Sequence, residues 1–522
     1  MTRREFLAAS AASVATLRAA DSWQAGDVAH LLPGANDRRI LLKASFRRAL
    51  AEPPKLLVGK RKVAGVRTDT AGRYWRFDAD GLPPGEEHRL ALEDHRGRAL
   101  CDPWPLKTFP ALDARPERFR LLVYTCAGGD ERVDASTGGV SFLSIARRQR
   151  LFDRALTFQP DAAIGNGDHT YWDLYRTGFP PRYGDDELRR AVGEFDRTLP
   201  ILGTANEDVL KHVGEAQIAS LYGVRFRSTP MFFTQDDHDY FENDEANDKM
   251  VTLPPDHLML QLGRGVRRLW FPEFLPDPNR PAGLPGASAP DTPPGTGESY
   301  GTLRYGKLAE ILLFDCRRYL SLAGPNAWIV PPETEQWLMD RMADNSVRNL
   351  VNLPSMPPVW TAGKWGDWGP DVLGPDGELT DKVQKPYWQE GWARQHDRLM
   401  KATSEQSERI PLWISGDMHA HGQAKVLRAG EVDLSRNPVN VFLSGAMSTD
   451  VGGWPSGWRK TPPKISSRVT VETPQPALEE NGFLIVDFEE SGVTVRSFKW
   501  RPHDGDEAID TLEPFRTVTL KT

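Results

Sequence analysis

The sequence MFFTQDDHDYFEND, residues 231–244, joins a short apolar run to a dense group of acidic side chains. Three consecutive apolar residues, 231–233, are typical of a buried strand. The carboxylates that follow are close enough to repel one another unless a cation neutralises them. Alone, the stretch indicates either part of a metal site at a strand end or a solvated acidic loop, with neither favoured. The polar side chains concerned are Asp236, Asp237, His238, Asp239 and Asn243.

The same design recurs at four other places along the chain. Each is a short apolar strand candidate that ends in side chains of chemical interest, and helical patterns alternate with these candidates. Such side chains at the carboxyl ends of strands are the expected arrangement of an α/β enzyme, so the repetition favours the metal site over the acidic loop. The four strand candidates are residues 119–125, 161–165, 310–314 and 411–414, and they lead into TCAGG (125–129), GDHTY (167–171), DCRRY (315–319) and SGDMH (415–419).

The side chains at these strand ends form a mixed set of metal ligands. Thiolate, phenolate and imidazole groups favour a redox-active transition metal such as iron, whereas a neighbouring all-oxygen set favours calcium or another hard dication. Asp168, near the middle of the set, is suited to bridge two metals. The candidate ligands are Cys126, Asp168, Tyr171, Asp237, Asn243, Asp417 and His419.

Length and composition indicate a globular protein with two or more domains. Its 522 residues are 39% apolar and 26% charged, which is enough to bury a large core. A net charge of −7 with both signs interspersed gives no basic surface, so nucleic acid is not expected as a specific partner. The three cysteines, Cys101, Cys126 and Cys316, are too few for a disulfide framework.

The first twenty residues predict export. Thr2-Arg3-Arg4-Glu5-Phe6-Leu7 is a twin-arginine pattern, and the weakly apolar segment that follows is too short to span a membrane. The expected partner during secretion is therefore the twin-arginine export machinery, and the expected location is periplasmic or extracellular. This route often serves proteins that acquire a metal or cofactor before export, which agrees with the metal-site interpretation.

Residues 26–112 are predicted to form a small all-β domain. Short apolar or alternating segments bounded by Pro, Gly, Asp or Asn, such as Tyr74-Trp75-Arg76-Phe77, indicate a β-sandwich of immunoglobulin or fibronectin type. The segment from Cys101 to Pro116 contains four prolines and is the expected linker. Residues 117–522 then form the α/β domain that carries the candidate ligands.

In chain order, the motifs TCAGG, GDHTY, DDHDYFEND, DCRRY and SGDMH resemble those of the alkaline phosphatase D (PhoD-like) family of metallophosphoesterases. The resemblance covers essentially the whole chain and includes the twin-arginine start and the N-terminal β-sandwich. It implies a four-layer αββα sandwich, in which helices flank two stacked mixed sheets. It also implies a binuclear iron–calcium site that hydrolyses phosphate esters with a metal-activated water or hydroxide.

The resemblance also implies roles for individual residues. Cys126, Asp168, Tyr171 and His419 would hold Fe³⁺. Asp168, Asp417, Asn243 and one of Asp236 and Asp237 would hold Ca²⁺ or another divalent metal. His238 and Arg317 would face the phosphate. Two departures from the family pattern affect substrate specificity: Ala127-Gly128-Gly129 replaces a polar residue after the cysteine, and Leu320 replaces a second arginine.

Each assignment has a simpler alternative. Cys126 could be a buried apolar residue, Tyr171 could pack against Trp172, and Arg317 could pair only with Asp315. Asp168, Asp417 and His419 could cap turns beside Gly167 and Gly416. The Trp-rich segment, residues 353–398, is expected to be a lid or wall of the pocket, or a core helix in its second half.

At the level of the whole protein, the sequence leaves several functions open. Phosphomonoesters, phosphodiesters and phospholipids cannot be distinguished as substrates, so a phospholipase D-like phosphodiesterase is one alternative. Another is an exported calcium-binding protein without phosphatase activity. Cys126 argues against this second alternative, because a thiolate is a poor calcium ligand.

Overall fold

The computed structural model describes residues 23–133, 141–175, 190, 192–240, 246–247, 250–287, 289, 291–472 and 476–521. The predicted twin-arginine segment, residues 1–20, and the predicted calcium ligand Asn243 lie outside this part of the chain. Within it, no helix is long and apolar enough to cross a membrane.

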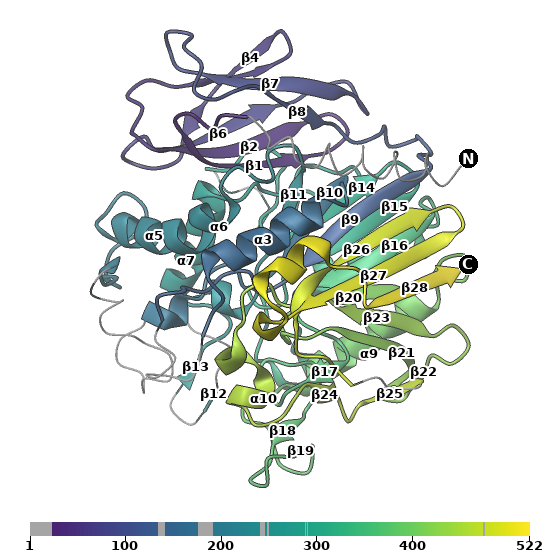
Figure 1. Ribbon diagram of the computed structural model, residues 1–522. Helices are drawn as coiled ribbons and strands as arrows, with labels where there is room; N and C mark the ends of the chain where they lie inside the picture. Colours follow the sequence, from purple (N-terminus) through teal and green to yellow (C-terminus); the bar gives the residue numbers. More distant parts are fainter. Residues whose placement is uncertain are drawn as a thin grey trace.

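The first part of the chain is a two-sheet β-sandwich, purple at the top of Figure 1. Side chains from both sheets, among them Leu42, Trp75, Leu90 and Trp104, meet in one core. The small N-terminal β-sandwich of the predicted fold class is therefore confirmed. One sheet contains, in order, β1 (Val28–Ala35), β2 (Ile40–Phe46), β6 (Tyr74–Ala79) and β5 (Val66–Arg67); the other contains β4 (Arg61–Ala64), β3 (Lys55–Val58), β7 (Glu87–Glu93) and β8 (Trp104–Lys107).

The second part begins with a six-stranded mixed sheet. Strands β9, β10 and β11 are parallel, and they match the strands predicted at 119–125, 161–165 and 231–233 to within one residue. The C-terminal hairpin β26–β27 pairs through β26 with β9, and β28 pairs with β27 and forms the edge of the sheet on that side. The order is β11 (Met231–Thr234), β10 (Ala162–Asn166), β9 (Arg118–Tyr124), β26 (Asn481–Glu489), β27 (Gly492–Trp500) and β28 (Arg516–Lys521).

The second large sheet contains the other two predicted strands, β15 and β20. Strands β15, β16, β20 and β23 run parallel, while β14, β21, β22 and β25 are antiparallel to their neighbours. The order is β14 (Tyr300–Tyr305), β15 (Ala309–Phe314), β16 (Asn349–Pro354), β20 (Leu412–Ser415), β23 (Val439–Leu443), β21 (Gly422–Ala429) and β22 (Val432–Asp433), with β25 (Val469–Glu472) also on β21.

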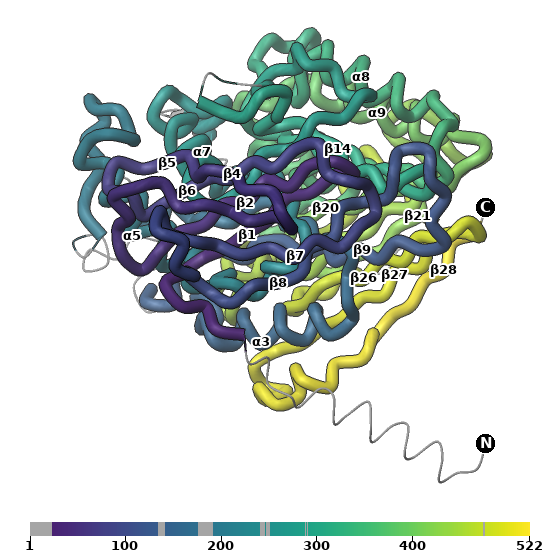
Figure 2. The backbone as a smooth tube through the Cα atoms, turned by 90° about the horizontal axis from the view of Figure 1, so that it is seen from above, coloured from purple at the N-terminus to yellow at the C-terminus, as the bar shows by residue number. Residues whose placement is uncertain are grey.

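The two large sheets stack face to face, with helices on both outer faces. Alternate residues of β9 divide between the layers: Leu121 and Val123 belong to the core between the sheets, whereas Tyr124 packs outward against Phe152. Behind the second sheet, Trp413 donates a hydrogen bond to Thr403. The predicted four-layer αββα sandwich is therefore confirmed. On one side lie α3 (Ile145–Leu156), α5 (Asn206–Gly214), α6 (Ser220–Tyr222) and α7 (His257–Leu269), labelled in Figure 1; on the other lie α8 (Pro332–Ala343) and α9 (Glu390–Ser404), labelled beside each other in Figure 2.

The Trp-rich segment contributes to both predicted structures. Its second half contains α9, where Trp392 and Leu399 are fully buried, so the core-helix alternative is confirmed there. Its first half is irregular and reaches the cavity described below through Ala362 and Lys364. Short two-stranded ribbons complete the fold: β12 (Ala246–Asn247) with β13 (Met250–Val251), β17 (Trp360–Thr361) with β24 (Lys464–Ile465), and β18 (Val372–Leu373) with β19 (Leu379–Thr380).

The N-terminal sandwich lies over one end of the large sheets, as the view from above shows (Figure 2). Its strand β1 contacts β11 and α6, and β2 contacts α7. Lys43 on β2 is fully buried, and its Nζ donates to Glu273 Oε1 at 2.8 Å and to the Arg268 carbonyl at 3.1 Å. The two parts of the chain are therefore joined by a buried ion pair as well as by apolar contacts.

Candidate metal centre

The candidate ligands come together at the carboxyl ends of five strands from both large sheets. Cys126 follows β9, Asp168 follows β10, Asp236 and Asp237 follow β11, Arg317 follows β15, and Asp417 and His419 follow β20. Almost all of these side chains are buried, although they are polar. The strand ends predicted to carry the chemistry therefore form one site.

The backbone at this site is strained in a way that few residues adopt. Cys126, Asp168, Asp417 and His419 have φ values of 48°, 57°, 66° and 49°, in the left-handed region that glycine favours. Each such residue costs on the order of 1–3 kcal/mol, and such strain persists only where surrounding structure enforces it. Strain at four candidate ligands is a pattern that occurs at functional sites, and turn capping alone does not require it.

Two glycines make the close approach of these loops possible. A Cβ at Gly416 would lie 2.2 Å from Thr125 Oγ1, and one at Gly167 would lie 2.6 Å from the Asp236 Cβ. The loops are then tied together through Thr125, whose Oγ1 donates to the Asn166 carbonyl at 2.7 Å and accepts from the Asp417 N–H at 3.3 Å. Gly167 and Gly416 therefore allow the loops after β9, β10, β11 and β20 to pack directly against one another.

Asp239 fixes the loops after β10 and β11. This buried carboxylate accepts hydrogen bonds from four backbone N–H groups, at 2.8 to 3.0 Å, and its donors are Asp168, His169, Thr170 and Asp236. Its two oxygens are thereby used by the backbone. Asp239 is therefore a residue that positions the neighbouring candidate ligands, and the sequence alone did not distinguish it from them.

One group of side chains fits a transition metal. Cys126 Sγ lies 3.2 Å from Asp168 Oδ2, and the Tyr171 hydroxyl lies 3.5 Å from the same oxygen and 3.2 Å from His419 Nε2. His419 Nδ1 lies 2.9 Å from the Gly453 carbonyl, which can only accept, so Nδ1 carries the proton. The Nε2 lone pair is then directed toward the group, an arrangement typical of a metal-binding histidine.

A second group consists of carboxylates with two protein cations. Arg317 Nε donates to Asp236 Oδ1 at 2.5 Å, and Arg317 Nη2 lies 3.4 Å from Asp417 Oδ2. Lys364 Nζ lies 2.7 Å from Asp417 Oδ1 and 3.1 Å from Asp237 Oδ2. Lys364 therefore bridges two predicted calcium ligands, and its ammonium partly offsets their charge.

The remaining oxygens of this group fit a bound cation. Asp168 Oδ1, Asp236 Oδ2 and Asp237 Oδ1 are buried and have no hydrogen-bond partner within the described residues. An unpaired buried carboxylate oxygen is strongly unfavourable unless a cation or a donor reaches it. Ligand atoms of Cys126, Asp168 and His419 lie within 4.8 Å of one another, as do those of Asp236, Asp237 and Asp417. The donor set therefore fits both a softer and a harder metal ion.

The pKa values of the site reflect burial and crowded negative charge. Burial, followed by the charges of Asp237 and Asp236, raises the pKa of Asp168 well above its usual range. Burial and the neighbouring Asp168 also raise the pKa of the Cys126 thiol. Burial raises the pKa of Asp236 to about 7 although Arg317 opposes the shift. Without a cation, burial and like charge disfavour the ionised forms of these groups. Cation binding and the ionisation of these groups would therefore favour each other.

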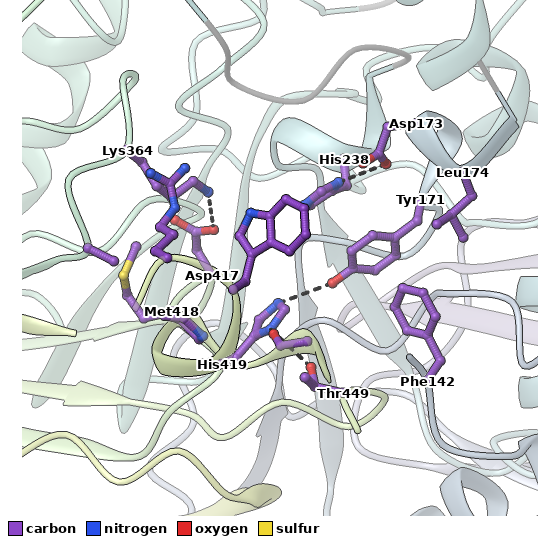
Figure 3. A pocket seen from close by; sticks show the side chains of 15 residues that line it. Phe142, Tyr171, Asp173, Leu174, His238, Lys364, Asp417, Met418, His419 and Thr449 are labelled. Carbon is purple, nitrogen blue, oxygen red and sulfur yellow. Dashed lines mark hydrogen bonds and ion pairs between the residues drawn. The ribbon is translucent and has the colours of Figure 1, made fainter. Parts of the chain in front are cut away.

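The two residues predicted to face the phosphate occupy different positions. His238 lines a cavity of about 90 Å³, with Nδ1 2.9 Å from Asp173 Oδ1 and Nε2 4.0 Å from Asp237 Oδ2 (Figure 3). Burial lowers the pKa of His238, but Asp173, Asp237 and Asp168 outweigh it and raise the pKa well above its usual value. Arg317 lies deeper, fully buried between Asp236 and the Gly366 carbonyl.

Several residues of the cavity carried no clear sequence signal. Asp173 lies only two residues after Tyr171, which was the one available hint. Lys364 lies in the Trp-rich segment, residues 353–398. That segment was predicted to be a wall of the pocket because of its aromatic residues, and nothing in the sequence distinguished Lys364 from other lysines. The Gly453 carbonyl, which orients His419, offers no signal at all because any residue has a backbone carbonyl. Tyr171 does not simply pack on Trp172, since its ring contacts Phe142 and His238.

Comparison of the sequence with protein-family models and with curated proteins finds no match. Among solved structures, the fold is similar to that of PhoD, with a TM-score of 0.58 and 14% identity over 90% of this chain and 86% of that one. It is also similar to the purple acid phosphatase PPD1 from yellow lupin (Lupinus luteus) seeds, with a TM-score of 0.51 and 11% identity over 94% of this chain and 73% of that one. The chain therefore has the fold of a PhoD-like metallophosphoesterase.

Proposed function

We propose that the protein hydrolyses phosphate esters with the help of metal ions. The observation that carries this proposal is the site itself: a thiol, a phenol and an imidazole adjoin buried carboxylate oxygens without hydrogen-bond partners, and Tyr171, Asp417 and His419 of this site line one cavity. Such a donor set suits two different cations, and two adjacent cations are a recurring device for displacement at phosphorus. The similarity of fold to two phosphatases agrees with this function.

The proposed cations are Fe³⁺ and Ca²⁺. Cys126, Asp168, Tyr171 and His419 would hold the iron. Asp168, Asp417, Asn243 and one or both of Asp236 and Asp237 would hold the calcium. Cations bound there would lower the pKa of a water and draw charge from the phosphoryl oxygens. The hydrogen bonds of Thr125 and Asp239 to these loops would hold the donors in place before substrate arrives.

His238 is proposed to act on the leaving group. Asp173 fixes the ring through Nδ1, and the other nitrogen, Nε2, lies on the side of Asp237 within the cavity wall. A proton on Nε2 could then pass to the ester oxygen as its bond to phosphorus breaks. Asp173 would keep the ring in this orientation throughout the reaction, so it is a positioning residue.

Lys364 and Arg317 are proposed to divide the task of balancing charge. The Lys364 ammonium lines the cavity and touches two carboxylates, so it is placed to contact a phosphoryl oxygen directly. The Arg317 guanidinium is enclosed behind the carboxylates, so its contribution is to hold Asp236 and Asp417 in position. The predicted contact between Arg317 and phosphate remains a proposal that needs a shift of the side chain.

The proposed substrate is a small-molecule phosphate ester, and the proposed location is the periplasm or the cell exterior. The substrate classes to compare are phosphomonoesters, phosphodiesters and phospholipids. Residues 1–20 support export by the twin-arginine machinery to the periplasm or the cell exterior. A calcium-binding protein without phosphatase activity is the competing function.

The test is to measure metal content and turnover on the same preparation. We expect iron and calcium by elemental analysis, a visible charge-transfer band, and hydrolysis of chromogenic mono- or diesters. Chelation should abolish turnover, and added calcium should restore it and raise the unfolding temperature. Calcium alone, with no iron and no ester hydrolysed across the panel, would establish the calcium-binding alternative instead.

Cys126→Ser is the sharpest variant for this test. An alcohol is a far weaker ligand than a thiolate, so iron and activity should both fall while the fold is kept. Cys316→Ser is the matched control, because Cys316 is also buried and unpaired but lies outside the ligand groups. Wild-type iron content in Cys126→Ser would remove the thiolate from the metal site.

A further inference from the structure

The cavity beside the metal ligands has an apolar wall to which no role has been given. Phe142 packs edge-on against the ring of the candidate ligand Tyr171, with 5.0 Å between centroids. In Figure 3, Phe142 and Leu174 lie on the same side as Tyr171, and Met418 lies below Asp417. The apolar wall therefore directly adjoins the candidate metal ligand Tyr171. Its apolar members are Phe142, Leu174, Met418, Pro455 and Trp458.

The segment 449–459 supplies part of this wall and is fixed to the metal ligands. Its Gly453 carbonyl accepts from His419 Nδ1, and the Asp450 N–H donates to the Ser141 carbonyl at 3.0 Å. The Ser456 N–H donates to Glu479 at 2.8 Å, at the start of α10 (Pro455–Trp458). These bonds hold Trp458 at the cavity, where it is half-buried.

Apart from Arg459, the polar side chains that line the cavity are already paired with one another. His238 pairs with Asp173, Lys364 pairs with Asp237 and Asp417, and Thr449 lies 3.0 Å from His419 Nδ1. The hydroxyls of a sugar or glycerol group would lose water here and find few partners, which is unfavourable. An apolar group would instead gain from leaving water against Phe142, Leu174 and Trp458.

We propose that this apolar wall binds the organic group of the ester, and that the substrates are phosphate esters with a compact aromatic or other apolar group. The proposal rests on the proposed function, because the phosphate is what places the organic group beside the wall. It excludes polar sugar phosphates and glycerol phosphate as preferred substrates. Each ester is hydrolysed in the same way. The oxygen of water bonds to phosphorus, the bond between phosphorus and the ester oxygen breaks, and the alcohol leaves with one proton from water.

The test uses unreactive analogues, so that the chemistry of the leaving group cannot influence the result. Phenylphosphonate and methylphosphonate carry the same charged group, and their inhibition constants are measured on the metal-loaded protein. We expect phenylphosphonate to bind at least about tenfold more tightly, the scale on which apolar pockets discriminate. Trp458→Ala should remove most of this difference while metal content stays unchanged.

Two further variants make the test specific. Val451→Ala alters the same segment at a side chain that is 70% exposed and outside the cavity, so the ratio of the two inhibition constants should stay as in wild type. Phe142→Leu tests another residue of the wall, should Trp458→Ala fail to fold. Thermal unfolding and metal content are measured for all variants.

The outcomes separate this proposal from the function on which it rests. If esters are hydrolysed but the two phosphonates inhibit equally, the apolar subsite is wrong and the phosphatase function stands. If glycerol 3-phosphate matches 2-phenylethyl phosphate in kcat/KM, the preference for an apolar group is likewise wrong. If neither phosphonate binds and no ester is hydrolysed, the phosphatase function itself falls, and the subsite with it.

Discussion

His238 and His419 are close in space and alike in sequence, but their rings have different neighbours. The Nδ1 of His419 is held by a backbone carbonyl and its Nε2 joins Cys126, Asp168 and Tyr171, whereas His238 is held by the Asp173 carboxylate and lines the cavity. A carbonyl leaves an imidazole neutral and able to bind a metal, and a carboxylate favours its protonated form. Their substitution should therefore have different effects.

We predict that His419→Ala lowers iron content and thermal stability together, because metal binding stabilises only the folded chain. His238→Ala should keep both metals while kcat falls by on the order of a hundredfold, the usual contribution of a general acid. Elemental analysis and kcat on the two purified variants give the comparison. Equal metal loss in both would mean that His238 orients Asp237 and is not a catalytic residue.

The contribution of Lys364 is open to a similar test. Lys364→Met keeps the length of the side chain but removes the ammonium between Asp237 and Asp417. If Lys364 contacts the phosphoryl group, inorganic phosphate should inhibit the variant less strongly, and Lys364→Arg should restore part of the inhibition. Unchanged phosphate inhibition with lowered calcium affinity would assign Lys364 to the carboxylates alone.

At the scale of elements, the sequence predicted the strands that carry the site better than their surroundings. Residues 119–125, 161–165 and 411–414 are apolar runs of strand length that end in glycine-rich loops, and parallel strands bring their carboxyl ends together. The pairing of β26 with β9 joins residues more than 350 positions apart, so no local pattern in the sequence could predict it. The position of Arg317 behind the carboxylates likewise depends on the conformation of the loop after β15. The spacing of residues in the sequence does not predict that conformation.

The loops after β10 and β11 depend on Asp239, which leads to a prediction about these elements. Asp239→Asn replaces one acceptor by an amide N–H₂ that faces backbone donors, leaving buried N–H groups unpaired. Each unpaired donor costs about 1–3 kcal/mol, so stability should fall by at least that amount and metal occupancy should fall with it. Urea unfolding and elemental analysis test this.

Asp433→Asn is the matched control for Asp239→Asn. Asp433, at the end of β22, accepts an exposed hydrogen bond from the Ser435 N–H and lies outside the ligand groups, so neither stability nor metal content should change measurably. If Asp239→Asn binds metal and unfolds like the wild type, the four hydrogen bonds to Asp239 do not hold the site in place.

At the scale of the whole molecule, buried charged side chains join the N-terminal sandwich to the rest of the chain. Lys43 of β2 meets Glu273 after α7, and Asp69, before β6, meets Lys211 of α5 at 2.8 Å. Ion pairs of this kind stabilise little compared with apolar packing, but removal of one partner leaves an uncompensated charge. The interface should therefore tolerate paired substitutions better than single ones.

We predict that Lys43→Met destabilises the protein by about 3–5 kcal/mol, because Glu273 is left buried without its partner. The double variant Lys43→Met, Glu273→Gln should recover part of the loss, since its buried amide carries no charge. Arg61→Met, which removes a surface partner of Asp80 within the same sandwich, should unfold at the wild-type urea concentration. Iron content per folded chain should be unchanged in all three, because none of these residues lies near the ligands. If Lys43→Met is as stable as the wild type, the pair of Lys43 and Glu273 does not join the two parts of the chain, and the pair of Asp69 and Lys211 or the contacts of β1 with β11 and α6 must do so.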